Sequence, residues 1–361
     1  MALVLIHPYP DGEWADVRLQ GILKTALSGV KVRVIRKMEE LTPMNGERIL
    51  FAVPLGDTGI NLEYLKLLRF LRQHPQGLEG CTAGLIVDAA SQLYTKSVAS
   101  ELVFAANQAG CAFLGRPLVE ATISLSNFTI QAKNLHTDEM GAYHAAAREL
   151  VMRLEGEVFP KKERPRLLVL HASNHSKSNT MALWSQLRQR LGTAFDYDEI
   201  GLRNGTLSDC SGCPYTMCLH FGERGGCFYG GVMQNEVYPA LRRCDGVVML
   251  CPNYNDAISA NMTAFINRLT ALFRQTRFYD KALFALVVSG YSGNDILARQ
   301  LISGMNMNKS FYLPARFAML ETANVPGEAM AAPGIKERLD AFGKHILCTM
   351  RNVEKKENVN L

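Results

Sequence analysis

The sequence lacks long runs of lysine and arginine, and it lacks long uninterrupted apolar runs. Its 39 basic and 34 acidic residues are spread along the chain, which is typical of a solvated surface and excludes a strongly basic nucleic-acid-binding stretch. No segment reaches the roughly 18 consecutive apolar residues of a membrane span. The amino-terminal run MALVLIHPYP has no basic start of the kind found in signal peptides. We therefore expect a soluble cytoplasmic protein that binds neither nucleic acid nor membrane.

Cysteine, by contrast, is not scarce, since the chain has nine. Structural disulfides are rare in the cytoplasm, so these residues are expected to be thiols or ligands of a metal or cluster. An apolar content of 48% with 20% charged residues is typical of a globular protein. A length of 361 residues suits two domains, each large enough for its own core.

Short apolar runs alternate with segments of helical periodicity along the first half of the chain. Strands are predicted at 3–6, 30–35, 48–53 and 82–87, and helices at 15–26 and 62–71. This alternation predicts a parallel sheet with helices on both faces.

The pattern begins again after a charged connector that contains proline. The predicted organisation is a domain at 1–158, a linker at 159–165, a second domain at 166–350 and a polar tail at 351–361. The run Leu3–His7 resembles Leu167–His171, and the segments 54–71 and 252–269 have equal length. Further recurrences at one constant offset are Pro117 with Pro314, and Asn127 with Asn324. The shared order of these features favours an internal duplication. The chain would then contain two doubly wound parallel-sheet domains in tandem, which would resemble a homodimer within one chain.

The loop after the first predicted strand differs from its counterpart in the second half. His7–Glu13 contains two prolines and one glycine, and no cluster of Ser, Thr or Asn. Proline has no backbone N–H to offer a phosphate. The first domain is therefore expected to be a degenerate copy without a phosphate-binding loop.

Three successive strand ends in the second half carry small and polar residues. The first is the loop Ser173–Thr180, where hydroxyls precede a helix predicted at 181–191 and would form an anion site with its N-terminus. The second is Pro252–Asn255, whose tyrosine and asparagines could stack on and hydrogen-bond a planar heterocycle. The third is Ser289–Gly290, where glycine permits close approach of a ligand. Ordinary loops and helix caps are the alternative at each position.

This pattern resembles the NADPH-dependent FMN reductase family over about 167–347, and within it the iron–sulfur flavoprotein branch. The motifs are SxxxxSNT before a helix, a cysteine-rich excursion, DGVVMLCPNYNDAISANMTAFINRL and a late strand ending in Ser-Gly. The resemblance implies a flavodoxin-like fold, non-covalent FMN, and a usually dimeric assembly with the flavin near the interface. It implies that the FMN phosphate is held by Ser173, Ser178, Asn179 and Thr180. It implies that the isoalloxazine ring is lined by Pro252, Asn253, Tyr254 and Asn255, with Ser289 and Gly290 on the other side.

Four cysteines, Cys210, Cys213, Cys218 and Cys227, form the pattern Cys-x2-Cys-x4-Cys-x8-Cys. Four thiolates can ligate a [4Fe–4S] cluster, and Gly212, Gly225 and Gly226 among them permit tight turns. Zinc and metal-free thiols are the alternatives. The other cysteines are expected to be small buried hydrophobes: Cys81, Cys111, Cys244, Cys251 and Cys348. His171, His175 and His220 are interpreted as strand-end or loop residues without a catalytic role.

These observations predict an FMN-dependent oxidoreductase that passes electrons between NAD(P)H or a reduced carrier and a small acceptor, with an added [4Fe–4S] cluster. No catalytic side chain is predicted, because hydride transfer to flavin requires positioning. The first domain is expected to act as a built-in dimer partner, with Asp57, Thr58 and Asn61 reaching the flavin pocket. One alternative is an NAD(P)H:flavin or quinone reductase without a cluster. Another is a non-enzymatic redox carrier or sensor that signals to a protein partner.

Overall fold

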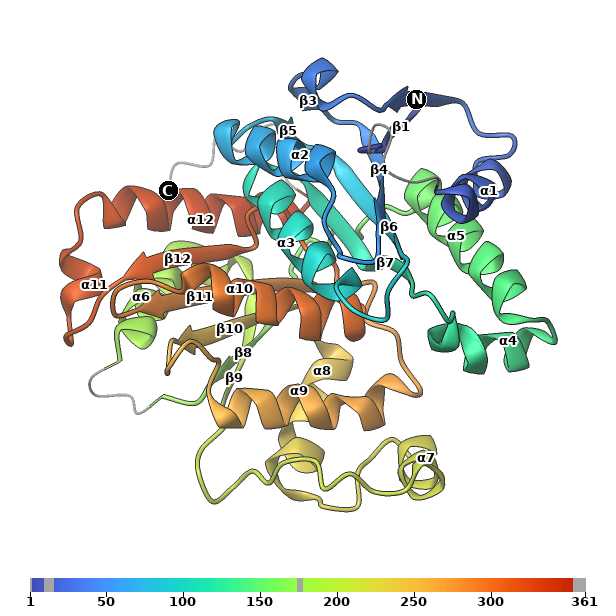
Figure 1. Ribbon diagram of the computed structural model, residues 1–361. Coiled ribbons are helices and arrows are strands. Elements are labelled where there is room, and N and C mark those ends of the chain that lie inside the picture. The colour runs from blue at the N-terminus through green and yellow to red at the C-terminus, as the bar shows by residue number, and fades with distance from the viewer. Residues whose placement is uncertain (1, 10–15, 174–177, 353–361) are drawn as a thin grey trace. The chain divides into compact units, whose positions relative to one another are not determined.

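The computed structural model describes residues 2–9, 16–173 and 178–352 (Figure 1). The chain forms two compact units, Met1–Val158 and Phe159–Leu361. In the described ranges no helix has both the length and the apolar character needed to cross a membrane.

The first unit is built on a five-stranded parallel sheet. Its strands are β1 (Leu3–Ile6), β2 (Val32–Ile35), β4 (Arg48–Leu55), β6 (Thr82–Ala89) and β7 (Ala112–Ala121), in the order β2-β1-β4-β6-β7. In chain order this is 2-1-3-4-5, the flavodoxin-like arrangement. A separate two-stranded sheet pairs β3 (Met44–Asn45) with β5 (Leu78–Glu79).

Helices cover this sheet through apolar faces. They are α1 (Val17–Ala26), α2 (Leu62–Gln73), α3 (Thr95–Gln108), α4 (Thr129–Leu135) and α5 (Glu139–Gly156). One core cluster joins the strand residues Leu5, Leu50 and Ile86 to Ile22 of α1 and Leu150 of α5. Helices α2 and α3 contact each other, and α3 contacts β6 and β7.

The second unit repeats the same topology. Its strands are β8 (Arg166–His171), β9 (Asp196–Gly201), β10 (Gly246–Pro252), β11 (Ala282–Ser289) and β12 (Ala318–Thr322), in the order β12-β11-β10-β8-β9. All pairs are parallel, and the order in the chain is again 2-1-3-4-5. The prediction of two flavodoxin-like domains in tandem is confirmed by these two matching sheets.

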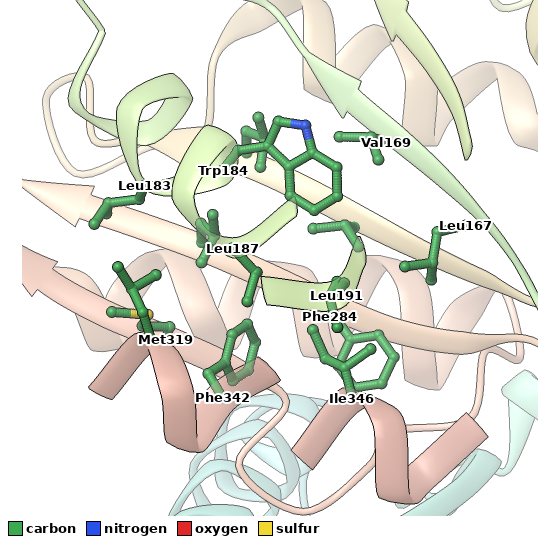
Figure 2. Packing of buried hydrophobic residues seen from close by; sticks show 14 of the residues in the cluster. Leu167, Val169, Leu183, Trp184, Leu187, Leu191, Phe284, Met319, Phe342 and Ile346 are labelled. Carbon is green, nitrogen blue, oxygen red and sulfur yellow. The ribbon is translucent and has the colours of Figure 1, made fainter. Parts of the chain in front are cut away.

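The second unit has helices on both faces of its sheet and a further helix in the connection between β9 and β10. They are α6 (Asn179–Leu191), α7 (Tyr215–Glu223), α8 (Tyr238–Arg243), α9 (Ala260–Phe273), α10 (Asn294–Leu301), α11 (Glu328–Ala331) and α12 (Ile335–Met350). The face shared by α6 and α12 buries Trp184, Leu187, Phe284, Phe342 and Ile346 in one cluster (Figure 2). On the other face, α8 contacts β8 and α10 contacts β11. Two π-helical segments, η4 (Met233–Val237) and η5 (Ile302–Asn308), also belong to this unit.

Edge strand β9 shows why apolar patterning misses some strands. Its sequence DYDEIG has no apolar run, yet it pairs with β8 along its whole length. Its carboxylates are held by arginines: Arg166 contacts Asp196 at 3.0 Å, and Arg243 contacts Asp198 at 2.7 Å. Charged side chains are common on edge strands, where they oppose pairing with another chain.

Candidate flavin site

The carboxyl ends of β8, β10 and β11 lie next to one another, which brings the three predicted loops together. Leu250 of β10 is paired with His171, the last residue of β8. Pro252, the last residue of β10, is paired with Val288 of β11. In an open α/β sheet, this edge is where ligands bind.

The loop after β8 presents hydroxyl groups at the start of α6. Ser178 is the N-cap of this helix, and its Oγ lies 2.8 Å from Oγ1 of Thr180, which is buried. Ser173 is only 6% exposed, and its Oγ has no hydrogen-bond partner among the residues that the structure describes. Positions 174–177 of the predicted phosphate loop, with His175, lie outside the described residues. A buried hydroxyl with no partner beside a helix N-terminus suits an anionic ligand.

Asn179 has a structural role in the described chain. Its Oδ1 accepts hydrogen bonds from the backbone N–H groups of Gly327 (3.0 Å) and Ala329 (3.4 Å). Its Nδ2 donates to the carbonyl of Val325 at 2.9 Å. Asn179 therefore ties the start of α6 to the loop after β12, which leaves its side-chain oxygen little capacity for a phosphate.

The loop after β10 is fixed by Asn253. Its Nδ2 donates to Oγ of Ser289 (3.0 Å) and lies 3.2 Å from the carbonyl of Ser292, and its Oδ1 accepts from the backbone N–H of Asp256 (2.8 Å). Asn255 and Asp256 both have positive φ, 54° and 58°, and turn the chain sharply. Tyr254 precedes this turn with 54% of its surface exposed. An exposed ring on a fixed loop can stack on a planar cofactor.

The loop after β11 lies close to its neighbours. Ser289 is fully buried, and a Cβ added to Gly290 would lie 3.1 Å from Oδ1 of Asn324. Tyr291, which the sequence analysis did not single out, is 81% exposed, and its hydroxyl accepts from Nδ2 of Asn324 at 2.9 Å. Its position directly after Ser289-Gly290 was the signal available in the sequence. Tyr254 and Tyr291 thus give two exposed aromatic rings on adjacent loops.

These groups fit FMN. The unpartnered Ser173 hydroxyl and the N-terminus of α6 suit its phosphate. The polar loop of Asn253 and the ring of Tyr254 suit an isoalloxazine ring.

The four clustered cysteines lie in the connection between β9 and β10: Cys210 and Cys213 before α7, Cys218 within it and Cys227 after it. Cys210 is exposed, whereas Cys213, Cys218 and Cys227 are half-buried. Throughout the described parts of the chain, no three His, Cys, Asp or Glu side chains are grouped so that they could hold a metal ion. As placed, the cysteines do not fit a [4Fe–4S] cluster or a zinc ion, which need all four thiolates around one centre.

Residues 208–230, which include the four clustered cysteines, are called the cysteine segment below. Arg268 of α9 binds both ends of this segment. Its guanidinium donates to the carbonyls of Ser208 (3.4 Å) and Gly230 (2.8 Å), and the residue is only 2% exposed. The hydroxyl of Tyr238 donates to the backbone carbonyl of Arg268 at 2.7 Å. Local sequence patterning does not indicate this contact, because the partners are backbone carbonyls distant along the chain.

Four of the five remaining cysteines are buried, as predicted: Cys81, Cys111, Cys244 and Cys251. Burial raises the pKa of the Cys251 thiol to about 12, so it stays protonated at neutral pH although it lies beside the flavin loop. The expectation for Cys348 is wrong, because this residue is exposed on the solvent side of the amphipathic helix α12.

At the corresponding edge of the first unit, His7 and Asn61 bind groups of the same unit. His7 follows β1, and its Nδ1 lies 2.8 Å from the carbonyl of Ala52 and its Nε2 3.0 Å from Oδ2 of Asp16. Asn61 donates to the carbonyls of Pro8 and Pro54, both at 2.9 Å, and caps α2. Asn61 is therefore committed to local structure. The reach of Asp57 and Thr58 toward a flavin stays a prediction.

The comparisons with known proteins agree with this geometry. Residues 165–324 match the model of the NADPH-dependent FMN reductase family. The match confirms the resemblance of the second unit to NADPH-dependent FMN reductases. It does not test the resemblance to their iron–sulfur branch. No curated protein matches the chain.

Solved structures also resemble about half of the chain. An NAD(P)H:quinone oxidoreductase from Methanothermobacter marburgensis is 16% identical, with a TM-score of 0.40 over 51% of this chain and 97% of that one. A putative quinone reductase from Klebsiella pneumoniae is 14% identical, with a TM-score of 0.35 over 52% of this chain and 87% of that one.

Proposed function

We propose that the protein is an FMN-dependent oxidoreductase that takes electrons from NAD(P)H and delivers them to a small acceptor. The observation that supports this most directly is the meeting of three loops at one sheet edge in a segment that matches the FMN reductase family. FMN, when bound, supplies the hydride and electron chemistry. The protein positions the reactants.

Each loop has its own task in this proposal. Ser173, Ser178 and Thr180, with the N-terminus of α6, hold the phosphate. Asn253 keeps the loops after β10 and β11 in register through its hydrogen bond to Ser289. Tyr254 and Gly290 border the planar ring, and the exposed Tyr291 lies where a flat acceptor could stack.

The test is FMN binding by purified protein and the Ser173→Ala variant. The wild type is expected to bind FMN, measured by quenching of flavin fluorescence. Ser173→Ala is expected to bind it about tenfold more weakly, because one hydrogen bond to the charged phosphate is lost. Ser208→Ala provides the control, because this serine lies in the cysteine segment. Absence of FMN binding by folded wild-type protein would reject the proposal.

A [4Fe–4S] cluster on Cys210, Cys213, Cys218 and Cys227 remains a separate proposal, supported by spacing and by resemblance. The half-buried and exposed positions of the four thiols offer no assembled centre. Iron and acid-labile sulfide analysis of anaerobically purified protein decides it. Stoichiometric iron and sulfide that disappear in Cys213→Ser would support the cluster, and their absence from wild-type protein would leave a flavin or quinone reductase with free thiols.

A further inference from the structure

Two cationic side chains lie beside the carboxyl-terminal end of α9, away from the flavin loops. Lys309 directly follows η5 and is only 7% exposed. Its Nζ donates to Oγ1 of Thr270 at 2.9 Å and to Oδ1 of Asn308 at 3.0 Å, and both acceptors are neutral. Arg274 directly follows α9, and its guanidinium lies 4.6 Å from the ring centre of Tyr215.

Each of the two cations has an N–H donor for which the described residues provide no acceptor. An ammonium group has three N–H donors, and the described residues provide Lys309 with partners for two of them. The Nε of Arg274 is buried, with no acceptor in the described part of the chain. Stacking on Tyr215 leaves this N–H unused, because the contact involves the face of the guanidinium.

The charges around Lys309 do not balance it. Burial lowers the pKa of Lys309, the positive charge of Arg274 lowers it further, and the thiol of Cys210 acts in the opposite direction. No carboxylate is among these groups. A buried cation near a second positive charge is costly unless an anion accompanies the two.

We propose that Lys309, Arg274 and Thr270 form a binding site for a phosphate-like dianion. Two negative charges would balance the two cations, and several oxygens on one centre could accept from both free donors. Thr270 accepts from Lys309, so its hydroxyl proton is free to donate to the same ligand. The site lies at the carboxyl-terminal end of α9, whereas Tyr254 precedes the amino-terminal end of this helix. The 14 residues of α9 rise roughly 20 Å along the helix axis. The site therefore does not depend on the proposed flavin chemistry.

The experiment is calorimetric titration of the full-length protein with inorganic phosphate at constant ionic strength, with chloride as the reference anion. Saturable phosphate binding is expected, and Lys309→Met should weaken it at least about tenfold. Lys344→Met is the matched control, because Lys344 is an exposed lysine on α12, a helix that contributes no residue to this site. Absence of saturable binding by the wild type, or equal affinity in Lys309→Met, overturns the site.

Phosphate binding by two further variants completes the test. If Lys309→Met does not fold, Thr270→Val takes its place, and it should also weaken phosphate binding. Cys210→Ser tests whether the thiol itself is the anion: unchanged binding supports the site, whereas binding that appears only in Cys210→Ser overturns it.

Competition identifies the source of the phosphate group. If NADPH displaces phosphate and NADH does not, the natural ligand carries the phosphate on a nucleotide. If neither displaces it, the ligand is free phosphate or another phosphoester. Both results support the dianion site, and neither requires bound FMN.

Discussion

Asn253 donates a hydrogen bond to Oγ of Ser289 at 3.0 Å and thereby joins the ends of β10 and β11. The Oδ1 of the same side chain accepts from the backbone N–H of Asp256, so the turn that carries Tyr254 is fixed to the sheet. Asn253 thus sets the position of one flavin loop relative to another.

Asn253→Ala should weaken FMN binding by about tenfold or more, because the lost hydrogen bonds allow both loops to shift. The dissociation constant, from flavin fluorescence quenching, measures this effect. Asn235→Ala, at an exposed position in η4, is the control and should bind FMN as the wild type does. Equal affinity in both variants would contradict the role given to Asn253.

Asp16→Asn should destabilise the first unit in a pH-dependent way. Burial alone would raise the pKa of Asp16, but the hydrogen bond and charge of His7, with the hydrogen bond from Gln20, lower it overall. Because the folded pKa lies below the ordinary value of 3.8, the ionised carboxylate stabilises the fold above that pH. This contribution is lost as the pH falls through the folded pKa.

The expected loss in Asp16→Asn at neutral pH is about 1–3 kcal/mol in the free energy of unfolding. Urea denaturation at neutral pH and below pH 3.8 measures it, and the difference from the wild type should shrink in acid. A difference that is constant over this range would rule out the carboxylate as its origin.

Arg268→Met should loosen the cysteine segment, since Arg268 holds the carbonyls of Ser208 and Gly230. The half-buried Cys218 and Cys227 should then react faster with a thiol reagent, by about tenfold if one charge-assisted contact is lost. Mass spectrometry of labelled peptides measures each rate. Arg277→Met is the control, because Arg277 is exposed. Similar labelling rates in both variants would show that Arg268 does not hold the cysteine segment in place.

Leu187→Ala should lower the free energy of unfolding of the second unit by about 2–5 kcal/mol, because it leaves a cavity between α6 and α12. Leu187 is fully buried, and its Cδ1 would lie 3.5 Å from a Cβ on Gly343 of α12. Leu135→Ala, at a largely exposed position of α4, should cost far less. Thermal or urea unfolding of both variants tests this ranking.

Part of the site followed from the chain alone. Polar residues placed directly after buried apolar strands indicated Ser173, Asn253 and Ser289, because parallel strands end at one edge. Asn179 shows the limit of that reasoning. Its sequence context is that of a phosphate loop, yet its amide is engaged by Val325 and Gly327, nearly 150 positions further along.

The sequence by itself determined the alternation of strands and helices and the repetition of that pattern, because burial on both faces of a parallel sheet requires continuous apolar runs. It also determined which loops are polar. Only the tertiary structure decided that Tyr291 lies exposed beside those loops, that Arg268 holds two backbone carbonyls, and that the buried Lys309 donates to Thr270 and Asn308. Contacts of this kind depend on side chains from separate elements meeting in space, and local patterning carries no record of them.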